Sequence, residues 1–133
     1  MPVRLRPADP VEAAAATARF RAGGRDAADL RLLTKHTLAL LVAEAPGGAV
    51  EVRVPPYAAA QAIPGTRHTR GTPPAVVETD AETWIGLALG DLTWQDAVEQ
   101  GRIAASGERS DLSAYVPVGR GPGAATSSDP PLQ

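Results

Sequence analysis

The amino-acid sequence predicts an α+β domain in which helices cover one face of a sheet. Three observations predict this fold class. Apolar residues recur at helical spacing over Asp26–Ala45. Valines alternate with charged residues over Val50–Val54, which is the period of a half-buried strand. Two short helices, each with a polar first residue and a terminal glycine, then precede a further strand within Thr79–Gly107.

The length of 133 residues suits one domain with a modest core. We expect an extended segment at residues 1–10, a single domain over residues 11–118, and a disordered tail over residues 119–133, which is rich in Gly, Pro and Ser. The hydrophobic fraction is 44%, yet aromatic residues make up only 4%, so Ala, Val and Leu must build the interior. Such small side chains suit either an internal cavity or a tightly packed core.

Composition also excludes several classes of function. A net charge of -2 and a pI near 5.6 argue against a nucleic-acid-binding protein. The absence of cysteine excludes disulfides, thiolate nucleophiles and cysteine-based metal sites. No apolar run approaches the ~20 residues that span a bilayer, and the first residues lack a continuous apolar signal core. We therefore expect a cytoplasmic protein without stable membrane insertion.

Two helices are predicted to open the domain. The first, Val11–Ala22, is rich in alanine. The second, Asp26–Ala45, has Asp26 as a candidate N-cap and Asp29 in its first turn, where a carboxylate interacts favourably with the helix dipole. His36 lies in the middle of this helix and has no partner at i+4 that could share a metal ion. This spacing favours a surface or structural histidine over a metal ligand.

Four segments are predicted to be strands. After Val50–Val54, the Pro55-Pro56 pair interrupts the ladder, because proline cannot donate a backbone hydrogen bond. Tyr57–Ile63 has enough alanine for a helix, but seven residues between prolines favour a strand. Ala75–Glu78 and Ile103–Ser106 are the remaining two strands.

The two short helices carry recognisable ends. Thr79 and Glu82 have the spacing of a capping box, and Gly90 suits the left-handed position after the helix. In the next helix Thr93 is the predicted cap and Gly101 the terminator. A last turn or short helix is expected over Ser110–Tyr115, with Leu112 and Tyr115 packing inward.

Residues Asp80–Leu112 resemble the C-terminal half of a sterol carrier protein domain. The residues that carry the resemblance are Trp84, Leu87, Gly90, Ala97, Gly101, Ile103, Gly107 and Leu112. The upstream stretch Glu51–Asp80, EVRVPPYAAAQAIPGTRHTRGTPPAVVETD, is similar to a small actinobacterial subgroup of sterol-carrier-like proteins. In all, the resemblance covers roughly residues 28–117.

This resemblance implies a mixed or antiparallel sheet of five strands covered on one face by helices. Between sheet and helices it implies a hydrophobic tunnel that accepts acyl chains or sterol-like molecules. Only four strands are visible in the sequence itself, and the fifth is expected near Tyr115–Val118. The chain is poor in Phe and Met, which often line adaptable apolar sites.

The leading hypothesis is a binding module for a hydrophobic or amphipathic small molecule. The candidate pocket residues are apolar and occupy inward-facing positions of the predicted elements. They are Leu38, Leu41, Val52, Val54, Ile63, Val77, Trp84 and Leu87. A candidate polar mouth, formed by His68, Arg70 and Thr72, is suited to an anionic head because arginine offers a bidentate fork. The alternative for this loop is solvated charge, or pairing with Glu78, Asp80 and Glu82.

A catalytic function is not expected. The two histidines, His36 and His68, belong to no cluster with metal-ligand spacing, so we expect no metal site, no cofactor and no catalytic residue. One alternative is an accessory subunit beside a separate enzyme, as the carrier-like domain is in mycothiol-dependent maleylpyruvate isomerase-like proteins. Another is an interaction protein or homodimer, in which Trp84 packs in the core and a partly exposed Trp94 anchors the interface.

Overall fold

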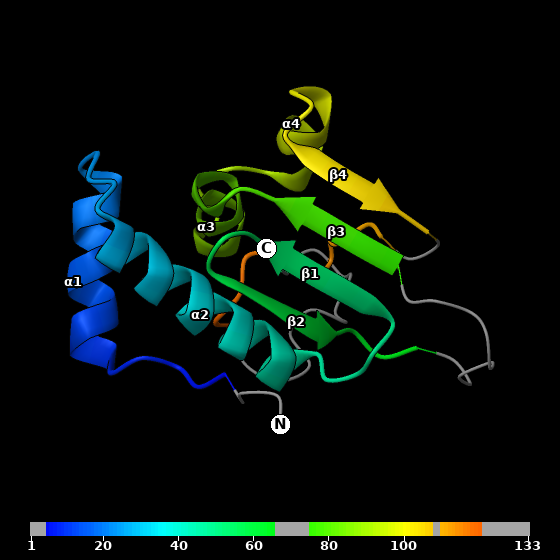
Figure 1. Ribbon diagram of the computed structural model, residues 1–133, viewed down its shortest axis with the longest axis horizontal. Coiled ribbons are helices and arrows are strands. Elements are labelled where there is room, and N and C mark those ends of the chain that lie inside the picture. The colour runs from blue at the N-terminus through cyan, green and yellow to red at the C-terminus, as the bar shows by residue number, and fades with distance from the viewer. Residues whose placement is uncertain (1–4, 66–74, 108–109, 121–133) are drawn as a thin grey trace, which may run out of the picture.

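The protein is described from a computed structural model, in which residues 5–65, 75–107 and 110–120 are the described part of the chain (Figure 1). The helices are α1 (Pro10–Arg21), α2 (Ala27–Glu44), α3 (Ala81–Leu89) and α4 (Trp94–Glu99). The strands are β1 (Val50–Val54), β2 (Ala58–Ala62), β3 (Ala75–Thr79) and β4 (Ile103–Ser106). The predicted order of helices and strands is confirmed as far as β4, and residues 113–115 form a turn rather than a short helix.

The four strands of the described chain form one mixed sheet in the order β2-β1-β3-β4. β1 pairs antiparallel with β2 and parallel with β3, while β4 pairs antiparallel with β3. In this register Val52 lies opposite Ala60 on one side and Val77 on the other. The predicted α+β class with a mixed sheet is confirmed.

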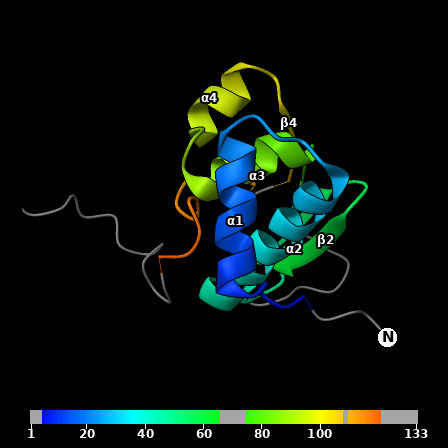
Figure 2. The ribbon, with the colours of Figure 1, turned by 90° about the vertical axis from the view of Figure 1, so that its left-hand side faces the viewer.

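Only one face of the sheet is strongly apolar. Val50, Val52 and Val54 are fully buried, whereas Arg53 between them is exposed. This alternation follows from the two-residue period of a strand. α2 and α3 pack on the buried face, and α1 lies outermost, on the side of α2 and α3 away from the sheet (Figures 1 and 2). The core therefore lies between the sheet and the helices α2 and α3.

Helix α1 is attached to its neighbours by arginine side chains near its C-terminal end. Arg19 donates from Nε and Nη2 to both carboxylate oxygens of Asp29, at 2.8 and 2.9 Å. Its hydrogen bond lowers the pKa of Asp29. Arg21 likewise donates to the two oxygens of Asp91, which follows α3. These paired geometries fix the angle at which α1 lies against the remainder of the domain.

The capping box predicted for α3 is wrong by one residue. Thr79 ends β3, and its hydroxyl donates to the carbonyl oxygen of Arg102 at 2.7 Å. Asp80 is the N-cap instead: its carboxylate accepts from the backbone N–H of Thr83 at 2.8 Å and from the Thr83 hydroxyl at 3.0 Å. Glu82 therefore has no capping role. Thr79 is the last residue of β3, and the next residue, Asp80, can cap the helix because aspartate is as good an N-cap as threonine.

The other predicted helix ends are mostly confirmed. Thr93 caps α4 by accepting from the backbone N–H of Asp96 at 3.1 Å. Gly90 ends α3 at φ 87°, in the left-handed region where glycine lacks the steric cost of a side chain. Asp26 does precede α2, but its side chain makes no capping hydrogen bond.

The fifth strand predicted near Tyr115–Val118 is not part of the sheet. The backbone N–H of Val118 donates to the carbonyl oxygen of Ala88 at 2.9 Å, so this segment pairs with the end of α3 rather than with a strand. The preceding turn does pack inward as predicted, since Leu112 is fully buried and Tyr115 is half-buried. This short segment covers the end of α3.

The predicted terminal segments are described only in part. Residues 5–9 precede α1 without regular structure, and Asp9 caps that helix by accepting from the backbone N–H of Val11 and of Glu12. At the other end, the backbone N–H of Gly119 donates to the carboxylate of Glu44 at 2.6 Å. The rest of the predicted tail, residues 121–133, lies outside the described residues.

Candidate functional site

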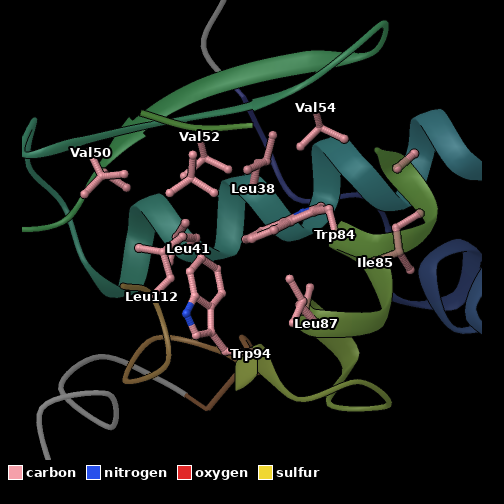
Figure 3. Packing of buried hydrophobic residues seen from close by; sticks show 14 of the residues in the cluster. Leu38, Leu41, Val50, Val52, Val54, Trp84, Ile85, Leu87, Trp94 and Leu112 are labelled. Carbon is pink, nitrogen blue, oxygen red and sulfur yellow. The ribbon is translucent and has the colours of Figure 1, made fainter. Parts of the chain in front are cut away.

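The eight predicted pocket residues converge in one buried apolar cluster between the sheet and the helices (Figure 3). Each of them is no more than 2% exposed. They come from five places that are spread along the sequence, namely α2, β1, the end of β2, β3 and α3. The cluster is the place where a ligand bound between sheet and helices would lie.

The indole of Trp84 lies across the centre of this cluster, between α2 and the valines of β1 (Figure 3). Its Nε1–H donates to the hydroxyl oxygen of Thr37 at 2.8 Å. The Thr37 hydroxyl in turn donates to the backbone carbonyl oxygen of Leu33 at 2.6 Å. A buried indole N–H needs such a partner, and this chain of two hydrogen bonds fixes the ring in place.

Sequence reasoning missed several members of the cluster. Val50, Ile85 and Leu112 belong to the cluster but were not among the candidate pocket residues, and Thr34 and Thr37 on α2 are buried as well. The alternation in β1 already contained the signal for Val50. The threonines of α2 fall on the apolar stripe by spacing alone, since Thr34 lies four residues before Leu38. They were passed over because threonine is not an apolar residue.

The candidate polar mouth, His68, Arg70 and Thr72, lies outside the described residues. The structure does describe the residues on either side of that segment. After it, the backbone N–H of Ala75 donates to the carbonyl oxygen of Ala49 at 3.0 Å, beside the start of β1. The segment thus rejoins the fold at the end of the sheet where β1 begins.

The carboxylates considered as partners for the mouth arginines have other partners. Glu78 lies 3.7 Å from Arg53 on the neighbouring strand, and Glu82 lies 3.2 Å from Arg25. Asp80 caps α3. These contacts are on the surface and individually weak, and the predicted pairing with the loop arginines lies outside the described residues.

A hollow of about 430 Å³ lies at the turn between β1 and β2. Its lining residues are Arg53, Val54, Pro55, Pro56, Tyr57, Ala58, Ala59 and Glu78. Only Val54 among these is a predicted pocket residue. Arg53 and Glu78 contribute exposed side chains from the sheet face opposite the valines, whereas Val54 belongs to the buried cluster, so the hollow lies at the edge of that cluster.

The alternative in which Trp94 is partly exposed is wrong. Its side chain is 9% exposed and belongs to the buried cluster, where it lies beside Leu112 and Leu41 (Figure 3). A tryptophan at this degree of burial has little free surface with which to anchor a partner. The large apolar side chains that are exposed in the described chain are Val11 and Val98.

Within residues 5–65, 75–107 and 110–120, no group of three or more His, Cys, Asp or Glu side chains is arranged to hold a metal ion. Within the same ranges, no helix has the length and apolar character needed to cross a membrane.

His36 has a structural role, as its position predicts. Its Nδ1 accepts a hydrogen bond from the backbone N–H of Ala8 at 2.9 Å, which ties the segment before α1 to α2. Nδ1 can accept only while the ring is neutral. Partial burial lowers the pKa of His36 from its ordinary value of 6.5, which also favours the neutral form.

We expect this histidine to make the fold less stable in mild acid. Because the pKa of His36 is lower in the folded than in the unfolded state, its contribution is complete above about pH 6.5 and is lost as the pH falls through the folded-state pKa. His36→Gln, which keeps an acceptor but does not titrate, should flatten this decline. The measurement is the urea midpoint of both proteins at about pH 7.5 and about pH 5. Equal pH dependence of the two midpoints would contradict the assignment.

A family model described as "Bacterial SCP ortholog" matches residues 25–118, which is more than two thirds of the chain and includes every element except α1. A search of curated proteins found no match.

Proposed function

Because this chain belongs to the bacterial family of sterol carrier protein orthologs, we propose that it binds and carries a hydrophobic or amphipathic small molecule of lipid or acyl type, without catalysing a reaction. The observation that carries the proposal is the convergence of the eight pocket residues. Side chains from distant segments meet in one apolar layer between the sheet and the helices α2 and α3. An apolar ligand placed there gains about 25 cal/mol for each Å² of apolar surface removed from water.

The burial of the eight candidate pocket residues limits how such a ligand can enter. The eight side chains are 0–2% exposed, so the ligand reaches them only when α2 and α3 move away from the sheet. The small Ala, Val and Leu side chains of this layer allow it to repack around a guest. Binding that requires such an opening should be slower than the ~10⁵–10⁷ M⁻¹s⁻¹ of preformed protein surfaces.

We assign the polar end of an amphipathic ligand to the predicted mouth. His68, Arg70 and Thr72 offer an imidazole, a guanidinium and a hydroxyl within five positions. Arginine binds a carboxylate or phosphate through two parallel hydrogen bonds. In this proposal the apolar body lies among the buried pocket residues and the anionic head stays near the solvent.

We expect dodecanoic acid to stabilise the protein against thermal unfolding. A ligand that binds only the folded state at one hundred times its Kd adds about 2.7 kcal/mol to the free energy of unfolding. The measurement is the melting temperature with and without the acid, together with native mass spectrometry of protein purified without removal of lipids. Butanoic acid is the control, since it has the same head and too little apolar surface. Equal melting temperatures with both acids would contradict the proposal.

A charge variant then tests the mouth. Arg70→Gln should weaken the binding of dodecanoic acid by roughly tenfold, because a hydrogen bond to a charged group is lost. Arg53→Gln is the matched control, since Arg53 is an exposed arginine on the far face of the sheet. If both variants weaken binding equally, general charge rather than a specific mouth is responsible.

A second candidate is an accessory subunit that works beside a separate enzyme. It is favoured by the hollow at the β1–β2 turn, which combines the Arg53–Glu78 pair with Tyr57. Among the described residues, the helices lie on the opposite face of the sheet and leave this side to a partner. Native mass spectrometry would show a partner as a mass above the 13.7 kDa of one chain, and Arg53→Glu should then abolish that complex.

A further inference from the structure

Thr34 carries a buried hydroxyl for which the described residues supply no hydrogen-bond partner. The residue lies on α2 and is fully buried. Within the described part of the chain, its Oγ1 has no hydrogen-bond partner. Nearly all buried polar groups in folded proteins are paired, so such an exception needs an explanation. A group that pairs only in the ligand-bound state is one such explanation.

The position of Thr34 on α2 ties it to the candidate pocket. Thr34, Leu38 and Leu41 follow one another at i, i+4 and i+7, and these three residues share one face of a helix. Leu38 and Leu41 on that face point toward the valines of β1 and the indole of Trp84 (Figure 3). The hydroxyl therefore belongs to the same face as two of the predicted pocket residues.

The hydroxyl of the nearby Thr37 on the same helix, in contrast, is hydrogen-bonded within the protein. Thr37 donates to the carbonyl oxygen of Leu33 at 2.6 Å and accepts from Nε1 of Trp84 at 2.8 Å. Because its proton is already donated to Leu33, Thr37 could offer a ligand only its second lone pair. Thr34 keeps both its donor and its acceptor capacity available.

We propose that Thr34 binds the inner end of the ligand, and that this end carries an uncharged hydrogen-bonding group such as a hydroxyl or a carbonyl. The proposal rests on the function proposed above. An ionised group is disfavoured there, because a buried charge needs a counter-charge. Asp29 is the one charged side chain among the buried residues of the described chain, and it is already paired with Arg19.

The ligand class follows from these contacts. Thr34 lies eleven residues before Ala45, or about 16 Å along the axis of α2. Ala45 accepts from the backbone N–H of Ile63 at 2.7 Å, close to the end of β2. The inner group is thus separated from that end of the fold by an apolar path. An alcohol, ketone or ester on a long apolar body fits this path, and a pure hydrocarbon leaves Thr34 unpaired.

The test compares two ligands and two variants. Decanol and decane, each delivered from a cyclodextrin complex, differ only in the hydroxyl group. Thr34→Val removes the protein hydroxyl at nearly constant volume, and Thr34→Ser keeps it. We expect Thr34→Val to weaken decanol binding by about tenfold and to leave decane binding within about twofold, while Thr34→Ser stays near the original protein for both. Displacement of a bound fluorescent fatty-acyl probe gives the affinities.

The outcomes separate this inference from the function on which it rests. If the original protein binds neither decanol nor decane, the proposed function is overturned together with the inference. If it binds both and Thr34→Val weakens both equally or neither, only the role of Thr34 is overturned. A second measurement needs no ligand: Thr34→Val should raise the melting temperature, because an unpaired hydroxyl is replaced by a methyl group. A lower melting temperature would show that the hydroxyl is already paired and would overturn the inference.

Discussion

Gly47→Ala is expected to lower the free energy of unfolding by at least about 3 kcal/mol. A Cβ atom at Gly47 would lie 2.2 Å from the carbonyl oxygen of Ile63 and 2.8 Å from the Cα of Pro64. Both are backbone atoms, so no side-chain rotation relieves the contact. Ile63 is itself held on both sides, because its N–H donates to Ala45 and its carbonyl accepts from Ala49. The loop before β1 must therefore shift, or the end of β2 must move.

The matched control is Gly23→Ala. Gly23 also has a positive φ, at +105°, but a Cβ there would meet nothing within 4 Å. It therefore incurs only the conformational cost of a left-handed backbone, about 1–2 kcal/mol. Urea unfolding of the two variants measures both effects. Similar losses in the two variants would mean that backbone conformation alone, and not the contact with Ile63, makes glycine necessary at position 47.

The close approach at Gly47 depends on an unusual residue that the sequence did not reveal. Ile63 has φ 77°, a conformation that is rare for a β-branched side chain. Its side chain is nevertheless 2% exposed and belongs to the buried cluster. The periodicity of Tyr57–Ile63 correctly predicted its burial, but a strained backbone arises from contacts with Ala45 and Ala49. Long-range contacts of this kind leave no local pattern in the sequence.

Most of the fold was predictable because its elements carry local signals. The alternation of Val50–Val54 and the apolar stripe of α2 each depend on periods that one segment displays alone. Errors arose where two local signals competed. Thr79 can cap a helix or end a strand, and its hydrogen bond to Arg102, 23 residues away, decides between the two. The prediction of a fifth strand was wrong for a similar reason, because the backbone N–H of Val118 donates to the carbonyl oxygen of Ala88 in α3.

The residues of the candidate site were predictable to a different degree. Burial of an apolar face is a property of each element, so the buried positions could be named before their contacts were known. The hydrogen bonding of Thr34 and Thr37 could not be predicted from the sequence, because it depends on where Trp84 of another helix places its indole. The hollow at the β1–β2 turn could not be predicted either, because its lining combines Arg53 of β1 with Glu78 of β3.

Trp84→Ala is expected to lower the free energy of unfolding by about 3–5 kcal/mol, the usual cost of removing a large buried aromatic side chain. The indole is fully buried, so the substitution removes both its packing contacts and its hydrogen bond to Thr37. Trp84→Phe separates these terms: it keeps most of the volume and should cost about 1–2 kcal/mol. Val98→Ala is the control, because Val98 is 51% exposed, and should change stability by less than about 0.5 kcal/mol.

The same variant also tests where the ligand lies. Removing the indole leaves an apolar void beside Leu38 and Val54, and voids of this kind stay dry and accept small apolar molecules. If the ligand binds in the cluster, decanol should raise the melting temperature of Trp84→Ala by more than it raises that of the original protein. If the ligand binds elsewhere, for example in the hollow beside Arg53, the gain should be unchanged. An unchanged gain together with a full loss of stability would assign Trp84 to the core and remove it from the pocket.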